Sequence, residues 1–143
     1  VADFGDLHTD DFSFTMELKH TLDKPRRRCK GVQIYLIFDG SAISIPLANK
    51  GCVANLDLMT FEEFVSGKTT DLSAFGVDME AWQKVQMQSR GGNLEIIINE
   101  QPVYQMPVPS KALAIKGISV YFEGTGKIKN VKFSNSAGRE EKL

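Results

Sequence analysis

The chain has 143 residues and a mass of 15.9 kDa, with 17 basic and 18 acidic side chains and a formal net charge of −1. Apolar residues make up 42% and charged residues 24%, as in ordinary globular domains, which excludes collagen-like and low-complexity classes. No apolar run approaches the roughly 20 residues of a membrane-spanning helix. We therefore expect one domain over residues 1–143, with no membrane-spanning segment and, given the balanced charge, no nucleic acid partner.

The two ends of the chain carry little structural signal. Val1 is not a start methionine and no charged-then-apolar stretch follows it, so we expect a mature product or an excised domain. Residues 135–143 (NSAGREEKL) are polar and charged, and we expect them to form a flexible tail.

The first half of the chain follows a period of two, the pattern of half-buried strands. The strands expected in this half are 12–18, 32–38, 42–47 and 52–59. Asp39-Gly40 is a strong signal for the hairpin turn between the second and third of them. Pro46 indicates a strand end or a sheet edge, because proline cannot donate a ladder hydrogen bond.

The middle of the chain changes character. Thr60 and Glu63 have the spacing of a capping box, and Gly67 suits a helix C-terminus, so we expect one or two helical turns over 60–67. The segment 78–90 is ambiguous, because its apolar residues fit a helical spacing and an alternating spacing equally well.

The last part of the chain returns to strand patterns. The strands expected here are 94–98, 102–104, 113–122 and 127–133. Asn99-Glu100 is expected to form a tight turn between the first two. With about eight or nine short strands and a turn roughly every 8–12 residues, the chain predicts an antiparallel β-sandwich or barrel.

The two cysteines, Cys29 and Cys52, do not have zinc-site spacing, so we expect no metal and no cofactor there. They form either one disulfide or two buried thiols of a cytosolic protein. We favour the disulfide, because each cysteine begins an apolar strand-like run and both have exposed-looking neighbours. A loop of about 24 residues would then contribute roughly 3.4 kcal/mol of stability, and the protein would belong to an oxidising, extracytoplasmic compartment.

A series of motifs runs through the second half: Trp82-x-x-Val85, Leu94-x-Ile96-Ile97-Ile98-Asn99, Gly117-Ile118-x-Val120-x-Phe122 and Gly124-Thr125-Gly126-x-Ile128-x-Asn130-Val131. Together with the opening Asp11-Phe12-Ser13-Phe14, this series resembles the concanavalin A-like lectin/glucanase superfamily, and in particular its laminin-G-like jelly-roll domains. Glu100 stands where the turn of that family usually has glycine.

The resemblance implies an all-β, antiparallel β-sandwich of jelly-roll type in which the first strand pairs with the last. It also implies that the ambiguous segment is a strand from Trp82 onward. Such domains are common modules of secreted and surface proteins of bacteria, which implies a periplasmic, cell-surface or secreted location.

The acidic residues do not form the pair that a retaining glucanase needs. That chemistry uses two carboxyl groups about 5–5.5 Å apart, and residues on one face of a strand are two or four apart in sequence. Glu62 and Glu63 are adjacent, and the remaining candidates are unpaired: Glu17, Glu80, Glu95 and Glu100. We therefore expect no enzyme activity.

Three other features have both a binding and a structural interpretation. Single aspartates could be calcium ligands, but none has DxDxDG spacing, so we expect turn or cap roles for Asp39, Asp57 and Asp71. The basic segment 24–30 (KPRRRCK) could grip an anionic polymer, but a solvated hairpin loop is the preferred interpretation. Trp82 could stack on a sugar ring, but as the single tryptophan, in a position that the family buries, it is expected in the core.

The outer face of the sandwich offers the strongest candidate site. If the apolar residues of the strands face the core, their neighbours Tyr35, Gln86, Gln88 and Tyr121 face outward, and we expect these four to contact a ligand. Hydroxyl, amide and aromatic groups suit sugar hydroxyls and ring C–H surfaces, and in lectin-like families the concave sheet often holds the ligand.

We therefore expect a non-catalytic binding module whose partner is a glycan or a protein, with carbohydrate as the leading ligand. The alternatives are a protein-binding, adhesion or structural module and a glycoside hydrolase-like domain.

Overall fold

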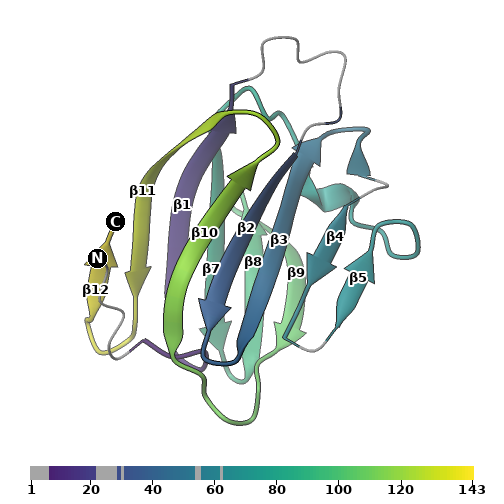
Figure 1. Cartoon of the computed structure of the whole chain (residues 1–143). Helices are drawn as coiled ribbons and strands as arrows, with labels where there is room; N and C mark the ends of the chain where they lie inside the picture. Colours follow the sequence, from purple (N-terminus) through teal and green to yellow (C-terminus); the bar gives the residue numbers. More distant parts are fainter. Residues whose placement is uncertain (1–6, 22–28, 30, 54–55, 62) are drawn as a thin grey trace.

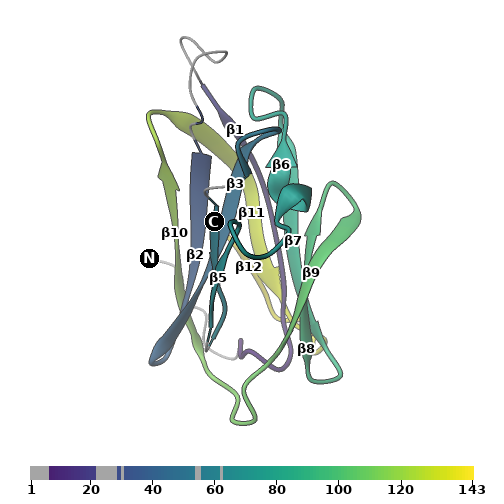
Figure 2. The same cartoon turned by 90° about the vertical axis from the view of Figure 1, so that its right-hand side faces the viewer.

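The protein is an antiparallel β-sandwich, as predicted. The computed structural model describes residues 7–21, 29, 31–53, 56–61 and 63–143. Two sheets lie face to face, and Figures 1 and 2 show them from the front and from the side. We call the one nearer the viewer in Figure 1 the front sheet, with the order β10-β2-β3-β4-β5, and the other the back sheet, with the order β12-β11-β1-β7-β8-β9.

The strands of the front sheet are β10 (Ile115–Phe122), β2 (Gly31–Phe38), β3 (Ser41–Asn49), β4 (Asp57–Met59) and β5 (Phe64–Ser66), with β6 (Gly76–Val77) paired in parallel to β3. The strands of the back sheet are β12 (Glu140–Lys142), β11 (Gly126–Ser134), β1 (Ser13–His20), β7 (Gln83–Arg90), β8 (Asn93–Ile98) and β9 (Gln101–Pro107). The long first strand β1 pairs with β11, as the resemblance implied, and the segment after Trp82 is strand β7.

The core lies between the two sheets and is built by the alternation of the strands. In β1, β2 and β7 every second side chain is buried, as the period of two predicts. The ring of Phe12, at the entrance to β1, lies edge-on to the ring of Phe38 of the front sheet, with centroids 6.4 Å apart. Burying such a side chain stabilises the fold by about 1.5–3 kcal/mol.

Both predicted hairpin turns are present. Gly40 has a φ of 78°, a left-handed conformation that glycine adopts without a steric penalty. At the second turn Asn99 and Glu100 both have positive φ, 50° and 69°, the combination that matches the twist of the flanking strands. Glu100 thus has a glycine-like backbone at the position where the resembling family usually has glycine.

The disulfide is present, with Cα atoms of Cys29 and Cys52 5.3 Å apart. It joins the segment before β2 to the segment after β3. Apart from Cys29, the basic run 24–30 lies outside the described residues. In the part of the chain that the structure describes, no helix has the length and apolar character to cross a membrane.

The predicted helical turn over 60–67 is wrong. The Thr60 hydroxyl does accept a hydrogen bond from the Glu63 N–H (3.0 Å), but the Thr60 N–H also donates to the Glu63 carbonyl (2.9 Å) and closes a tight turn. The chain then continues as β5, which pairs with β4. The capping bond forms without a helix, because the next residues find strand partners. A 3-10 helix is present at Ser73–Phe75.

Part of the segment 135–143, which we expected to be a flexible tail, forms a strand. Glu140–Lys142 forms β12 and pairs with β11. The carboxylate of Glu140 lies 3.2 Å from the ammonium of Lys142 and 3.6 Å from that of Lys132, and these two cations, Lys142 first, lower its pKa. The charged residues Glu140 and Lys142 therefore form ion pairs within the hairpin of β11 and β12.

Two strand boundaries differ from the prediction. The expected strand 52–59 is reduced to β4, because Cys52 turns back toward Asn49 through a 3.0 Å backbone hydrogen bond. Pro46 is within β3, between Ser44, which pairs with β4, and Ala48, which pairs with β6. Pro46 itself has no pairing partner on β4 or β6, so a proline is tolerated at this position of β3.

Candidate functional site

The four predicted contact residues lie on two opposite faces. Tyr35 of β2 and Tyr121 of β10 point outward from the front sheet, whereas Gln86 and Gln88 of β7 point outward from the back sheet. They cannot form one site, because the whole thickness of the core separates the two pairs. Alternation shows that a residue faces outward, but it does not show which sheet its strand joins.

The outer surface of the front sheet is neutral and rich in aromatic groups, and we call it the tyrosine face. Its outward positions are Gln33, Tyr35 and Ile37 on β2, Ala42, Ser44 and Pro46 on β3, Asp57 and Met59 on β4, Phe64 and Ser66 on β5, and Gly117, Ser119 and Tyr121 on β10. Of these positions, only Asp57 carries a charge at neutral pH. The exposed Lys116 lies beside them at the β-bulge of β10, and Glu63 lies beyond the end of β4.

Large side chains on the tyrosine face are unusually open to solvent. Phe64 is 69% exposed, Tyr121 60% and Ile37 41%. The fold does not require aromatic or apolar groups at these positions, because their inward neighbours already supply the core. Exposed apolar groups gathered on one face of a domain are typical of a binding surface.

Polar groups and a shallow hollow complete this face. The Ser44 hydroxyl donates to Oε1 of Gln33 (2.5 Å), which orients the amide within the sheet surface. The outward residues of β3 are all small, and their row ends in a hollow of about 270 Å³. The hollow is lined by Ser41, Ala42, Met59, Thr60, Phe61, Glu63 and Phe64.

Sequence reasoning missed Phe64 and Met59. The expected helical turn over 60–67 removed Phe64 from the strand pattern, and Met59, although within the expected strand 52–59, was left without its partner. The pairing of Met59 with Phe64 across β4 and β5 brings them to the tyrosine face. The useful signal was the alternation of Phe64, Val65 and Ser66, which is too short to identify a strand without its partner.

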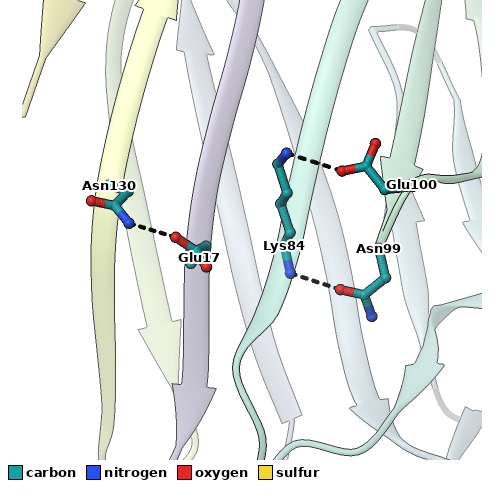
Figure 3. A network of polar contacts seen from close by, with 5 residues as sticks. All are labelled: Glu17, Lys84, Asn99, Glu100 and Asn130. Atoms are coloured by element: carbon teal, nitrogen blue, oxygen red, sulfur yellow. Dashed lines mark hydrogen bonds and ion pairs between the residues drawn. The ribbon is translucent and has the colours of Figure 1, made fainter.

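The outer surface of the back sheet is charged, and we call it the lysine face. Its lysines are Lys19 on β1, Lys84 on β7, Lys127, Lys129 and Lys132 on β11, and Lys142 on β12. Figure 3 shows part of this face, with five polar residues that contact one another. Asn130 donates to Oε2 of Glu17 (2.5 Å), and the ammonium of Lys84 lies 3.0 Å from Oε1 of Glu100.

Trp82 belongs to the lysine face, so its predicted place in the core is wrong. It is half-buried, and the ammonium groups of Lys129 and Lys19 lie 3.9 and 5.1 Å from its ring centroid. Because Gln83 and Val85 face inward, alternation places Trp82 outward. The same pattern that placed Val85 in the core could therefore have placed Trp82 on the surface.

Gln86 is poorly placed to contact a ligand. Its Oε1 atom is buried and has no hydrogen-bond partner among the described residues. A buried oxygen is as inaccessible to a ligand as to water.

The single aspartates do not gather into a metal site. The Asp71 carboxylate accepts a hydrogen bond from the Ser73 N–H (2.9 Å) at the start of the 3-10 helix. Hydrogen bonds from the Ser73 side chain and backbone lower the pKa of Asp71. Within the described ranges, no three His, Cys, Asp or Glu side chains lie close enough together to hold a metal ion.

Comparisons with known proteins agree with this architecture. No protein-family model matches the sequence, and no curated protein matches it. Among solved structures, the chain is similar to the carbohydrate binding module CBM66 from Bacillus subtilis, with a TM-score of 0.61 and 10% sequence identity over 91% of this chain and 78% of that chain. It is also similar to the Caenorhabditis elegans galectin LEC-6, with a TM-score of 0.51 and 13% identity over 90% of this chain and 89% of that chain. At such identities the likeness shows a shared β-sandwich fold.

Proposed function

We propose that this chain is a non-catalytic carbohydrate-binding module of the concanavalin A-like group, and that the tyrosine face holds the glycan. The observation that carries the proposal is the exposure of Tyr121 (60%) and Phe64 (69%) on a sheet face that also holds Tyr35. The names of the two similar structures, a carbohydrate binding module and a galectin, support a sugar as the ligand.

The chemistry of the face suits a neutral sugar. Aromatic ring faces pack against the apolar C–H surfaces of a pyranose or furanose ring. Pairs of aromatic rings gain about 0.5–1.5 kcal/mol beyond the area buried, and we expect a contact of similar size here. Hydroxyl and amide groups can donate to and accept from sugar hydroxyls. On this face they come from Gln33, Ser119 and the two tyrosines. The paired outward positions hold no lysine or arginine, and Lys116 lies at the β-bulge near one end of β10, which favours an uncharged ligand.

The disulfide supports an extracytoplasmic place of action, since such bonds persist in oxidising compartments. Glycans of cell surfaces and extracellular polymers are found there, so the proposed location and the proposed ligand agree. The laminin-G-like subgroup remains part of this proposal and rests on the sequence motifs.

A non-catalytic role is supported by the carboxylates of the tyrosine face. Glycoside hydrolysis needs two carboxyl groups at a set separation, and Asp57 is the single carboxylate at the outward positions listed above. Turnover of any polysaccharide by the pure protein would overturn this part of the proposal.

A glycan array followed by calorimetry on the best glycan tests the proposal. Alanine at Tyr35 or Tyr121 is expected to weaken binding up to about tenfold, because each removes one ring contact. Gln88→Ala is the matched control, because Gln88 is an outward residue on the opposite sheet. A folded protein that binds no glycan, or tyrosine variants that bind like the control, would contradict the proposal.

The exposed apolar groups of the tyrosine face also favour a second candidate, a protein-binding or adhesion module. The exposed apolar side chains of Ile37 and Phe64 could pack against apolar groups of a protein partner. This candidate predicts that Ile37→Ser and Phe64→Ser abolish binding to a protein partner, while the glycan array stays empty.

A further inference from the structure

Two lysines lie at one indole ring on the lysine face, and a third lies opposite one of them on the next strand. Lys19 of β1 stands opposite Lys127 of β11, and Glu17 stands opposite Lys129. Trp82 precedes β7, whose first residue, Gln83, pairs with the residue before Lys19. The two closest ammonium groups lie 3.9 Å (Lys129) and 5.1 Å (Lys19) from the centroid of the indole.

The positive charges of these lysines repel one another, and an anionic ligand would relieve this repulsion. Like charges directly opposite on neighbouring strands destabilise a sheet, and Lys19 and Lys127 are such a pair. The carboxylate of Glu17 accepts a hydrogen bond from Asn130, and the Lys129 ammonium lies over the indole. Within the described residues, no carboxylate is within ion-pair distance of these three lysines.

Other lysines of the same face provide a contrast. Lys84 lies 3.0 Å from Glu100, and Lys132 lies 3.6 Å from Glu140. These lysines have carboxylate partners within ion-pair distance, whereas among the described residues Lys19, Lys127 and Lys129 have none. The indole instead holds two of the ammonium groups near one another through cation–π attraction.

We propose that Lys19 and Lys129, held at Trp82, form with the neighbouring Lys127 a binding site for an acidic polysaccharide that carries carboxylate or sulfate groups. Lys127 and Lys129 are two residues apart on one strand, which spaces their Cα atoms by about 7 Å. Charges repeated at this spacing along a flat strand suit a polyanionic chain. This site is separate from the tyrosine face and does not depend on the function proposed for it.

An acidic glycan fits this surface better than an anionic membrane. Firm attachment to a membrane surface needs apolar side chains that enter the lipid. The aromatic group at this site, Trp82, is half-buried and has ammonium groups close to its ring. The lysines remain available to a ligand that approaches along the sheet, since Lys127 and Lys129 are exposed.

Binding at this site can be followed by tryptophan fluorescence, because Trp82 is the single tryptophan of the chain. We would titrate the protein with dextran sulfate and follow tryptophan fluorescence, with uncharged dextran as the matched probe. Dextran sulfate is expected to change the emission and dextran to leave it unchanged, with an affinity that falls as salt rises.

Variants locate the binding. Lys129→Ala and Lys127→Ala are each expected to weaken binding of dextran sulfate about tenfold, the usual size of one lost charge-assisted contact. Lys84→Ala and Lys132→Ala are the matched controls and are expected to bind like the parent protein, because these lysines already have carboxylate partners.

Four results would overturn the proposal: no binding of dextran sulfate, equal binding of dextran, equal loss in all four lysine variants, or binding to phosphatidylserine vesicles in place of dextran sulfate. Circular dichroism of each variant shows that it is folded. These results would not affect the function proposed for the tyrosine face. That proposal is tested with a neutral glycan and with Tyr121→Ala, a variant on the opposite sheet.

Discussion

The two outer faces of the sandwich follow the same strand alternation and differ in almost everything else. The outward positions of the front sheet carry tyrosine, phenylalanine and small residues, with one charge, Asp57. Those of the back sheet carry lysines on β1, β7, β11 and β12, and Trp82 lies beside them just before β7. Because inward residues make the core in both sheets, outward positions are free to differ, and their chemistry therefore reports what each face contacts.

The largest loss of stability is expected for the inward residues of a strand, and two neighbours in β2 allow an inward and an outward position to be compared. Ile34 and Tyr35 are neighbours in β2, and Ile34 is 0% exposed. Ile34→Ala should lower the free energy of unfolding by about 2–5 kcal/mol, because it removes buried methylene groups and leaves a cavity. Tyr35→Ala should cost less than half as much in urea denaturation. Equal losses would mean that Tyr35 is part of the core and would remove it from the proposed site.

Reduction of the disulfide is expected to have the next largest effect. Opening the link between Cys29 and Cys52 should lower the stability by roughly 3.4 kcal/mol, because the unfolded chain regains the freedom of a loop of about 24 residues. The measurement is urea denaturation with and without a thiol reductant, followed by the fluorescence of Trp82 on the opposite sheet.

A protein insensitive to reductant would contradict this expectation. The Cys29→Ser, Cys52→Ser double variant serves as the control, because it should have the stability of the reduced protein and should not respond to the thiol.

A crossed test compares the two faces directly. Tyr121→Ala should weaken binding of a neutral glycan up to about tenfold and leave dextran sulfate binding unchanged. Lys129→Ala should do the reverse. Both ligands are titrated against both variants by calorimetry. Loss of both ligands in either variant would show that one of the two faces is not a separate site.

Much of the fold could be predicted because its signals are local. Alternation identified β1, β2 and β10, and the turn residues at 39–40 and 99–100 identified two hairpins. The disulfide followed from the positions of two cysteines beside strand-like runs. Each of these signals lies within a few residues of the feature that it predicts.

The candidate site was harder, because its assembly depends on strand order. Tyr35 and Gln86 have the same outward pattern, but their strands join different sheets, and only the pairing partners reveal this. The hairpin that presents Phe64 was mistaken for a helical turn, because the Thr60 capping bond is common to both structures. In both cases the structure depends on pairing between strands, which short sequence patterns do not specify.

The smallest effect concerns the turn beside the lysine face. Glu100 has a φ of 69°, which costs a residue with a side chain about 1–2 kcal/mol. Glu100→Gly removes that cost, but it adds chain entropy to the unfolded state and removes the exposed ion pair with Lys84, worth about 0.2–1 kcal/mol. We therefore expect a rise in stability below about 1 kcal/mol by urea denaturation. Glu100→Gln, which removes the charge and keeps the Cβ atom, should be slightly less stable than the parent protein. If the glycine variant were no more stable than the glutamine variant, the backbone at Glu100 would carry no strain, and the ion pair with Lys84 would be the better explanation for the residue.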